Sequence, residues 1–156
     1  MGRRGTLQGL LGSLIALLWL ATTHVASEQP KEPPFRYAAG TEMLVQDCAG
    51  ELEVHSSELV FRCSIGSISV PFDSITRMQY RPDLSRYVRH LKVKWHVRPD
   101  FGSGKQNRYF TIVYKQNKIH HVIILKVAPH SMRPYLAEIE LRTGKRVEVM
   151  PYEEYS

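Results

Sequence analysis

The clearest pattern in the chain is an alternation of apolar and polar residues. It is strongest over residues 89–98, where every second residue from Leu91 to Val97 is Leu, Val or Trp and the residues around and between them are Lys, His or Arg. This period of two predicts a half-buried β-strand. Shorter or more apolar runs predict six further strands, over residues 50–55, 59–63, 67–72, 74–80, 108–114 and 118–127.

The period changes after residue 128 and predicts one helix over residues 131–142. Its apolar stripe has the spacing i, i+3, i+4, i+7 and consists of Met132, Tyr135, Leu136 and Ile139. Ser131 is a suitable N-cap, and Gly144 stands where a helix commonly ends in the left-handed conformation. His121 falls on the apolar face of the strand before the helix, so we expect a hydrogen-bonded core histidine there.

The predicted order of elements, together with one segment of the helix, resembles a known fold family. The segment Pro134-Tyr135-Leu136-Ala137-Glu138-Ile139-Glu140, followed by Arg142-Thr143-Gly144, is similar to the C-terminal part of small, uncharacterised exported bacterial proteins. Seven strands and a C-terminal helix resemble pleckstrin-homology-like domains, including the GRAM type. The resemblance implies a mainly β domain over residues 40–156. Its two near-orthogonal antiparallel sheets, residues 50–80 and 89–127, would form a seven-stranded barrel capped by the helix.

The chain also departs from this family. The predicted helix has no Trp, and the first hairpin turn, His55-Ser56-Ser57-Glu58, lacks the basic motif of phosphoinositide binders. Phosphoinositide binding is therefore not implied. Another small β-barrel or a β-sandwich is the alternative fold.

Residues 1–27 have the pattern of a secretory signal peptide. Arg3 and Arg4 precede a long uncharged, apolar run, and Val25 and Ser27 are small residues at a suitable cleavage site. Residues 28–39 contain several prolines and read as an extended linker. We therefore expect export to the periplasm or secretion; the alternative is an uncleaved N-terminal membrane anchor.

Export makes a disulfide between Cys48 and Cys63 the expected state of the two cysteines. If residues 50–55 and 59–63 form a hairpin, Cys48 lies about two residues from the position opposite Cys63, and neighbouring strands are ~4.8 Å apart. The alternative is a pair of free, buried thiols.

The charge pattern offers one candidate binding surface. The chain carries a formal net charge of +6. The cationic side chains concentrate around the predicted strand 89–98 in what we term the basic ridge: Arg86, Arg89, His90, Lys92, Lys94, His96 and Arg98. Such a ridge suits anionic lipid or polyanions, whereas export makes nucleic acid an unexpected ligand. The alternative is a solvated strand face without a ligand.

No pattern indicates catalysis, a metal or a cofactor. His120 and His121 are adjacent on a strand and point to opposite faces, so they do not chelate together. No serine lies in a nucleophile motif, and paired cysteines are not nucleophiles. The sequence therefore predicts a non-enzymatic interaction module that binds a protein or peptide in the cell envelope, for instance by strand addition. The alternatives are binding of an anionic surface by the basic ridge, and a hydrolytic or redox enzyme.

Overall fold

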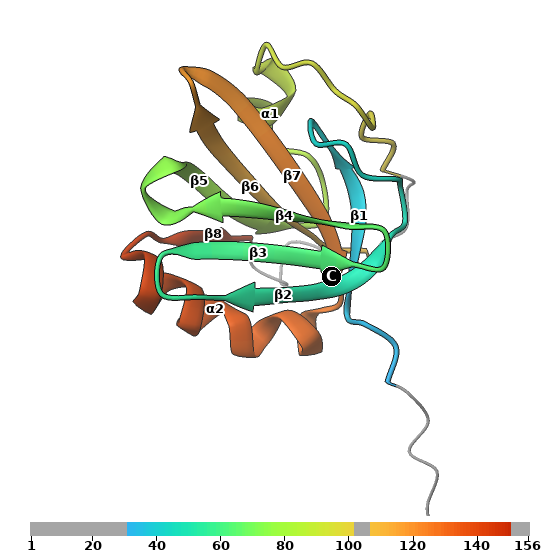
Figure 1. Ribbon diagram of the computed structural model, residues 1–156, viewed down its shortest axis with the longest axis vertical. Coiled ribbons are helices and arrows are strands. Elements are labelled where there is room, and N and C mark those ends of the chain that lie inside the picture. The colour runs from blue at the N-terminus through green and yellow to red at the C-terminus, as the bar shows by residue number, and fades with distance from the viewer. Residues whose placement is uncertain (1–30, 102–106, 151–156) are drawn as a thin grey trace, which may run out of the picture. The chain divides into compact units, whose positions relative to one another are not determined.

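The protein is described by a computed structural model that covers residues 31–101 and 107–150 (Figure 1). The signal peptide predicted for residues 1–27 lies outside the described residues. Within them, no helix is both long and apolar enough to cross a membrane. The elements are β1 (Phe35–Gly40), β2 (Ala49–Val54), β3 (Glu58–Cys63), β4 (Gly66–Pro71), the 3-10 turn η1 (Phe72–Ser74), β5 (Ile75–Arg81), α1 (Arg86–His90), β6 (Tyr109–Gln116), β7 (Ile119–Val127), α2 (Pro129–Thr143) and β8 (Val147–Val149).

The described strands form one sheet in the order β4-β3-β2-β1-β7-β6-β5-β8. All neighbours are antiparallel except β5 and β8, which are parallel. The mainly β class with a C-terminal helix is confirmed. The prediction of a seven-stranded barrel made of two near-orthogonal sheets is wrong, because β1 pairs with β2 on one side and with β7 on the other and joins all strands into one sheet.

Strand β1 replaces much of the predicted linker. Residues 35–39 were assigned to the linker 28–39, yet they lie in the middle of the sheet and are mostly buried. The register of β1 against β7 shifts between Tyr37 and Ala39, which is a β-bulge. Gly40 ends the strand at a close approach, since a Cβ there would stand 2.7 Å from the carbonyl oxygen of Val122.

Helix α2 covers one face of the sheet and, in Figure 1, lies beside β2. Met132 and Ile139 are fully buried in the main core, as the apolar stripe predicts. The helix begins two residues before the predicted start, because Pro129 takes the first helical position and Ala128 the N-cap. Gly144 caps its C-terminus with a φ of 66°, as predicted.

The segment predicted as the strand 89–98 is not a strand. Residues 86–90 form α1, and residues 91–98 run extended, with one bridge to the described part of the chain, between Val97 and Gly40. The alternation has a different cause: every second residue of 91–97 packs onto a second core on the outer face of β1, β7 and β6. Residues 91–97 thus cover the outer side chains of β6 and β7. Because both faces of these strands are buried, their sequences are continuous apolar runs without alternation.

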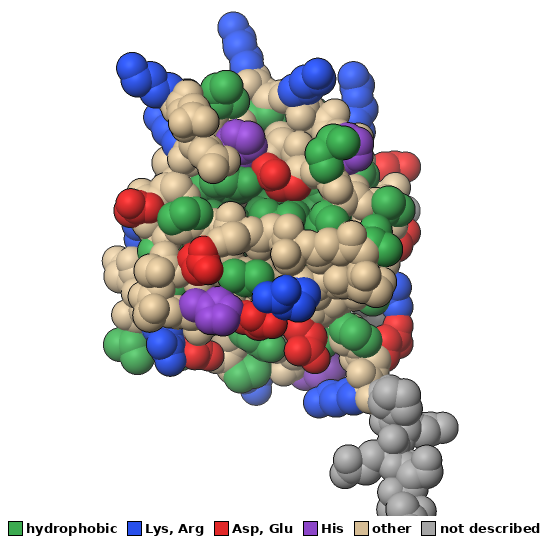
Figure 2. Space-filling model, viewed as in Figure 1, with side chains coloured by type: hydrophobic (Ala, Val, Ile, Leu, Met, Phe, Trp, Pro, Cys, Tyr) green, Lys and Arg blue, Asp and Glu red, His purple; other side chains and the backbone are tan. Residues whose placement is uncertain are grey.

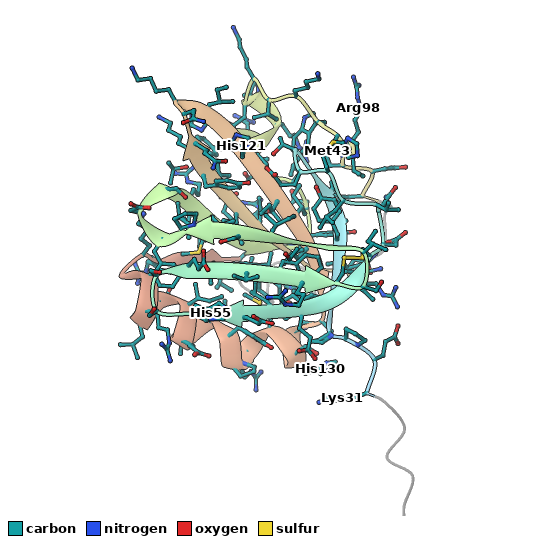
Figure 3. The ribbon with its side chains drawn as sticks, in the orientation of Figure 1. Lys31, Met43, His55, Arg98, His121 and His130 are labelled. Atoms are coloured by element: carbon teal, nitrogen blue, oxygen red, sulfur yellow. A yellow bond between two sulfur atoms is a disulfide. The ribbon has the colours of Figure 1, made fainter. Side chains whose placement is uncertain are left out.

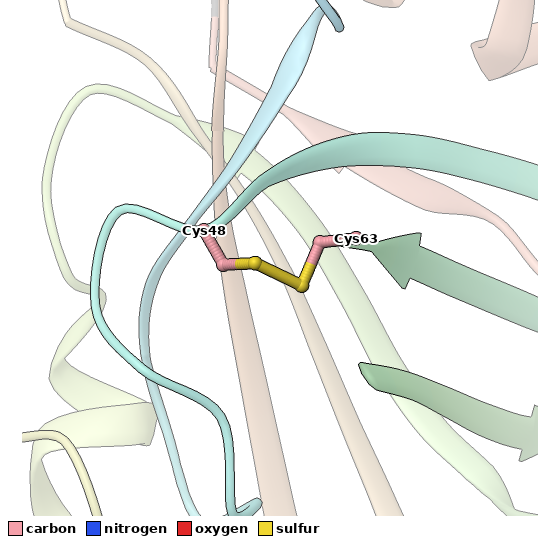
Figure 4. Close-up of a disulfide and its surroundings, with 2 residues drawn as sticks. All are labelled: Cys48 and Cys63. Atoms are coloured by element: carbon pink, nitrogen blue, oxygen red, sulfur yellow. A yellow bond between two sulfur atoms is a disulfide. The ribbon is translucent and has the colours of Figure 1, made fainter. Parts of the chain in front are cut away.

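The cysteines are joined as predicted. Cys48 and Cys63 form a disulfide with a Cα–Cα distance of 6.0 Å (Figure 4). The residue opposite Cys63 is Gly50, two positions from Cys48. A Cβ at Gly50 would stand 2.1 Å from the carbonyl oxygen of Arg62, so only glycine fits this close approach of β2 and β3.

Candidate functional site

A groove lies between the loop that follows β1 and the edge strand β4. The loop contributes Met43 and Leu44, and the start of β4 forms the opposite side. Tyr114 and Gln116 of β6 also line it, and its volume is about 310 Å³. In Figure 3, Met43 and His121 lie on the same side of β4, away from α2. Figure 2 shows hydrophobic side chains within the hollow at this place.

Among the described strands, β4 is the last at its end of the sheet and pairs only with β3. Ile68 and Val70 point into the core, whereas Ser67 and Ser69 are exposed. Pro71 has no N–H, and its carbonyl oxygen accepts a 2.7 Å bond from the Ser74 hydroxyl, so that end of the edge is closed. The open part of the edge is therefore the part that lines the groove.

Two large apolar side chains stand exposed at the rim of the groove. Met43 is 83% exposed and Ile65 is 59% exposed, and they lie on opposite sides of the groove, on the loop and in the β3–β4 turn. Leu44 is buried and packs against Gly66 at the start of β4, since its Cδ2 would lie 2.9 Å from a Cβ placed on Gly66. Exposed apolar side chains that gather around a hollow are typical of interaction surfaces.

A polar cluster centred on Glu42 borders the same groove. The Oε1 atom of Glu42 accepts a 2.6 Å bond from the Tyr114 hydroxyl, and it lies 2.9 Å from His121 Nδ1. The Thr41 hydroxyl adds a 3.2 Å bond to the same oxygen. The Tyr37 hydroxyl donates to the carbonyl oxygen of Glu42 at 3.2 Å. His121 is hydrogen-bonded, as the sequence predicts, and its partner comes from a distant loop. The predicted core position is wrong, because the side chain is 26% exposed at the border of the groove.

The tyrosines of the cluster keep their protons. Burial raises the pKa of Tyr37, and the nearby Glu42 carboxylate adds to the rise. Burial also raises the pKa of Tyr114, and the hydrogen bond to Glu42 and the charge of its carboxylate act in the same direction. Both hydroxyls are therefore lasting donors that hold Glu42 in place.

The cluster does not have the geometry of a catalytic triad. Thr41, His121 and Glu42 supply a hydroxyl, an imidazole and a carboxylate, but the hydroxyl lies 3.5 Å from the same Nδ1 atom that faces Glu42. A relay needs the carboxylate and the nucleophile on different ring nitrogens. Among residues 31–101 and 107–150, no group of three or more His, Cys, Asp or Glu side chains is placed to hold a metal ion.

The basic ridge is brought together as an exposed surface, although not on a strand. Arg86, Arg89 and His90 are exposed on α1, and the other four members alternate as exposed residues along the extended segment 91–98. Arg89 faces the carboxylate of Asp83 at 3.8 Å. Figure 2 shows Lys and Arg side chains projecting at the top of the view, where Figure 3 labels Arg98.

Sequence reasoning missed Glu42 and Tyr114 as site residues. They are 72 residues apart and meet only because β1 lies beside β7, and β7 beside β6. The one available signal was a polar residue, His121, on an apolar strand face, because such a residue needs a partner. Comparison of the sequence with protein-family models gave no match, and comparison with curated proteins gave none either.

Proposed function

We propose that the protein is a non-enzymatic interaction module that binds an extended segment of a partner protein. The segment adds to the sheet as a strand beside β4. The observation that carries this proposal is the open edge of β4, at Ser67 and Ser69, directly beside a groove with an apolar rim. Edge strands present N–H and C=O groups without a neighbouring strand, and these groups are what strand addition uses.

The groove supports specificity as well as backbone pairing. An added strand lies about 4.8 Å from β4, and alternate side chains then point toward the groove. Ile68 forms its apolar floor, while Met43 and Ile65 stand on the two sides. A flexible, unbranched side chain such as Met43 suits contact with varied apolar residues. The preferred segment is thus an alternating one whose groove-facing residues include apolar side chains.

The test is selection of peptides from a random library on the full-length protein with its disulfide intact. The affinity of each selected peptide is measured by calorimetry. Two N-methylated copies of the peptide are measured beside it, one methylated at the odd and one at the even backbone positions. Strand addition requires that N-methylation of the paired positions abolishes binding. A selected peptide that binds equally well after N-methylation at either set of positions refutes the proposal.

A pair of protein variants tests backbone pairing by changing β4 instead of the peptide. Ser69→Pro removes a backbone N–H from the edge of β4, where proline is tolerated. Ser69→Ala removes the side chain and keeps the N–H. Loss of binding in Ser69→Pro together with full binding in Ser69→Ala supports backbone pairing, and equal binding by both variants contradicts it.

We also propose that the chain shares the strand order of pleckstrin-homology-like domains, with β8 added. Strands β1 to β4 are sequential neighbours, β5 to β7 are sequential neighbours, and a C-terminal helix packs on the sheet. The same proposal includes export through residues 1–27. The disulfide supports export, because such bonds persist in oxidising compartments.

The second candidate function is binding of an anionic surface by the basic ridge. The observation that favours it is that Lys92, Lys94 and Arg98 all point to solvent while the residues between them pack on the sheet. Co-sedimentation with neutral and anionic vesicles at two salt concentrations tests it. Salt-sensitive binding to anionic vesicles that is lost when these three residues become Ser supports it, and no vesicle binding refutes it.

A further inference from the structure

Of the residues that the structure describes, Glu42 is the one charged residue that lines the groove beside β4. The other described lining residues are apolar, aromatic or uncharged, and neither Lys nor Arg is among them. The carboxylate is partly withdrawn from water, with its side chain 26% exposed. A charge in such a place attracts an opposite charge more strongly than a fully solvated one does.

The hydrogen bonds around Glu42 orient the carboxylate without requiring a cation. Tyr114 and Thr41 donate as neutral hydroxyls, and His121 Nδ1 donates in the neutral form of the ring as well. All three contacts are to Oε1. The second carboxylate oxygen therefore remains as an acceptor for a ligand, and the first holds the side chain in one position.

We infer that the strand added to β4 carries a Lys or Arg side chain that pairs with Glu42. This inference rests on the function proposed above and names the chemistry of the partner. Met43, exposed beside Glu42, offers an apolar surface for the methylene stem of such a side chain.

A carboxylate on β3, next to the edge strand, strengthens the preference for a basic segment. Glu58 of β3 accepts a hydrogen bond from the hydroxyl of Ser69, and both side chains lie on the solvent-facing side of the edge. A segment with Glu or Asp would therefore meet a like charge on either face, from Glu42 at a position that faces the groove and from Glu58 at a position that faces solvent. The edge of β4 therefore favours a cationic partner, although the chain as a whole is positively charged.

The experiment uses short strand-forming peptides in three matched series, in which one position at a time carries Lys, norleucine or Glu. Norleucine keeps the apolar stem of Lys and removes the charge. One position is expected to bind roughly fivefold more tightly with Lys than with norleucine, as a single partly exposed ion pair would give, and Glu there is expected to bind most weakly. Equal affinity of Lys and norleucine at every position overturns the inference.

Two protein variants assign the effect to Glu42. Glu42→Gln keeps an oxygen that accepts from Tyr114, so the cluster is retained while the charge is removed; the control, Glu51→Gln, removes an exposed carboxylate on β2 away from the groove. The Lys preference should vanish in Glu42→Gln and persist in Glu51→Gln. A preference that persists in Glu42→Gln overturns the inference.

The outcomes separate this inference from the function on which it rests. If norleucine peptides bind as well as Lys peptides and N-methylation still abolishes binding, strand addition stands and the role of Glu42 fails. If N-methylation has no effect, strand addition fails, whichever residue the peptide carries. The peptide series needs no protein variant, so equal affinity of Lys and norleucine overturns the inference even where Glu42→Gln does not fold.

Discussion

The disulfide between Cys48 and Cys63 joins the two sides of the groove. Cys48 ends the loop that carries Glu42, Met43 and Leu44, and Cys63 begins the turn that carries Ile65. The Cα atoms are 6.0 Å apart, and the bond closes 15 residues of chain. The same covalent link therefore stabilises the fold and fixes the spacing between the loop and β4.

Replacing both cysteines by Ser should lower the free energy of unfolding by about 3 kcal/mol, because the unfolded chain regains the freedom of the closed loop. Urea denaturation of the variant and of the oxidised wild type measures the difference. The reduced wild type serves as control and should match the variant. Equal midpoints for the variant and the oxidised protein would contradict a stabilising role of the disulfide.

Two glycines should respond differently to Ala. In Gly50→Ala the new Cβ would stand 2.1 Å from a backbone oxygen of Arg62, and we expect a loss of about 1–3 kcal/mol or more, as for overpacking. Gly66→Ala meets only the end of the Leu44 side chain, at 2.9 Å, which can move aside. Its loss of stability in urea denaturation should be clearly smaller. A larger effect at Gly66 than at Gly50 would show that the contact between β2 and β3 is less tight than described.

The packing of helix α2 on the sheet should depend on Ile139 and not on Leu141. Ile139 is fully buried, whereas Leu141 is 84% exposed on the same helix. Ile139→Ala should destabilise the protein by about 2–5 kcal/mol, and Leu141→Ala by about 0.5 kcal/mol or less. Thermal or urea unfolding of the two variants provides the comparison. Similar effects would mean that α2 does not pack with the face assigned here.

Stability should fall in alkaline solution. The pKa values of Tyr37 and Tyr114 are raised in the folded protein, whereas an unfolded tyrosine ionises near pH ~10. Above that pH the unfolded chain loses these protons first, so the stabilisation is complete below it and declines as the pH rises. Urea denaturation across this range measures the slope, which should be shallower in Tyr114→Phe. A stability that is constant above pH ~10 would contradict the burial of these hydroxyls.

The sequence pattern predicted which side chains are exposed and which are buried more reliably than it predicted which segments pair as strands. The alternation over residues 91–98 placed Lys92 and Lys94 in solvent, which the structure confirms. It did not reveal that Val93 and Trp95 pack on the sheet without belonging to one of its strands. An alternation of apolar and polar residues indicates that a segment has a buried and an exposed face, but it does not show whether the backbone is hydrogen-bonded to a neighbouring strand. Strand β1 was missed for the opposite reason: buried on both sides and interrupted by a bulge, it has no alternation.

The groove could not be predicted from the sequence pattern, because its residues come from segments that are far apart in the chain. Glu42 comes from a loop, Tyr114 from β6 and His121 from β7, and only the pairing of β1 with β7 brings them together. Strand addition as a mode of binding was predicted without a place for it. The edge of β4 supplies that place, and its position at the end of the sheet follows from long-range topology.

The most direct measurement is the mapping of a selected peptide onto the isotopically labelled protein by NMR. The account predicts that amide shifts concentrate at Ser67 and Ser69, in the loop from Glu42 to Leu44, and at Tyr114, and that new contacts join the peptide backbone to β4. Shifts confined to the basic ridge, from Lys92 to Arg98, would place the binding surface elsewhere and contradict strand addition at β4.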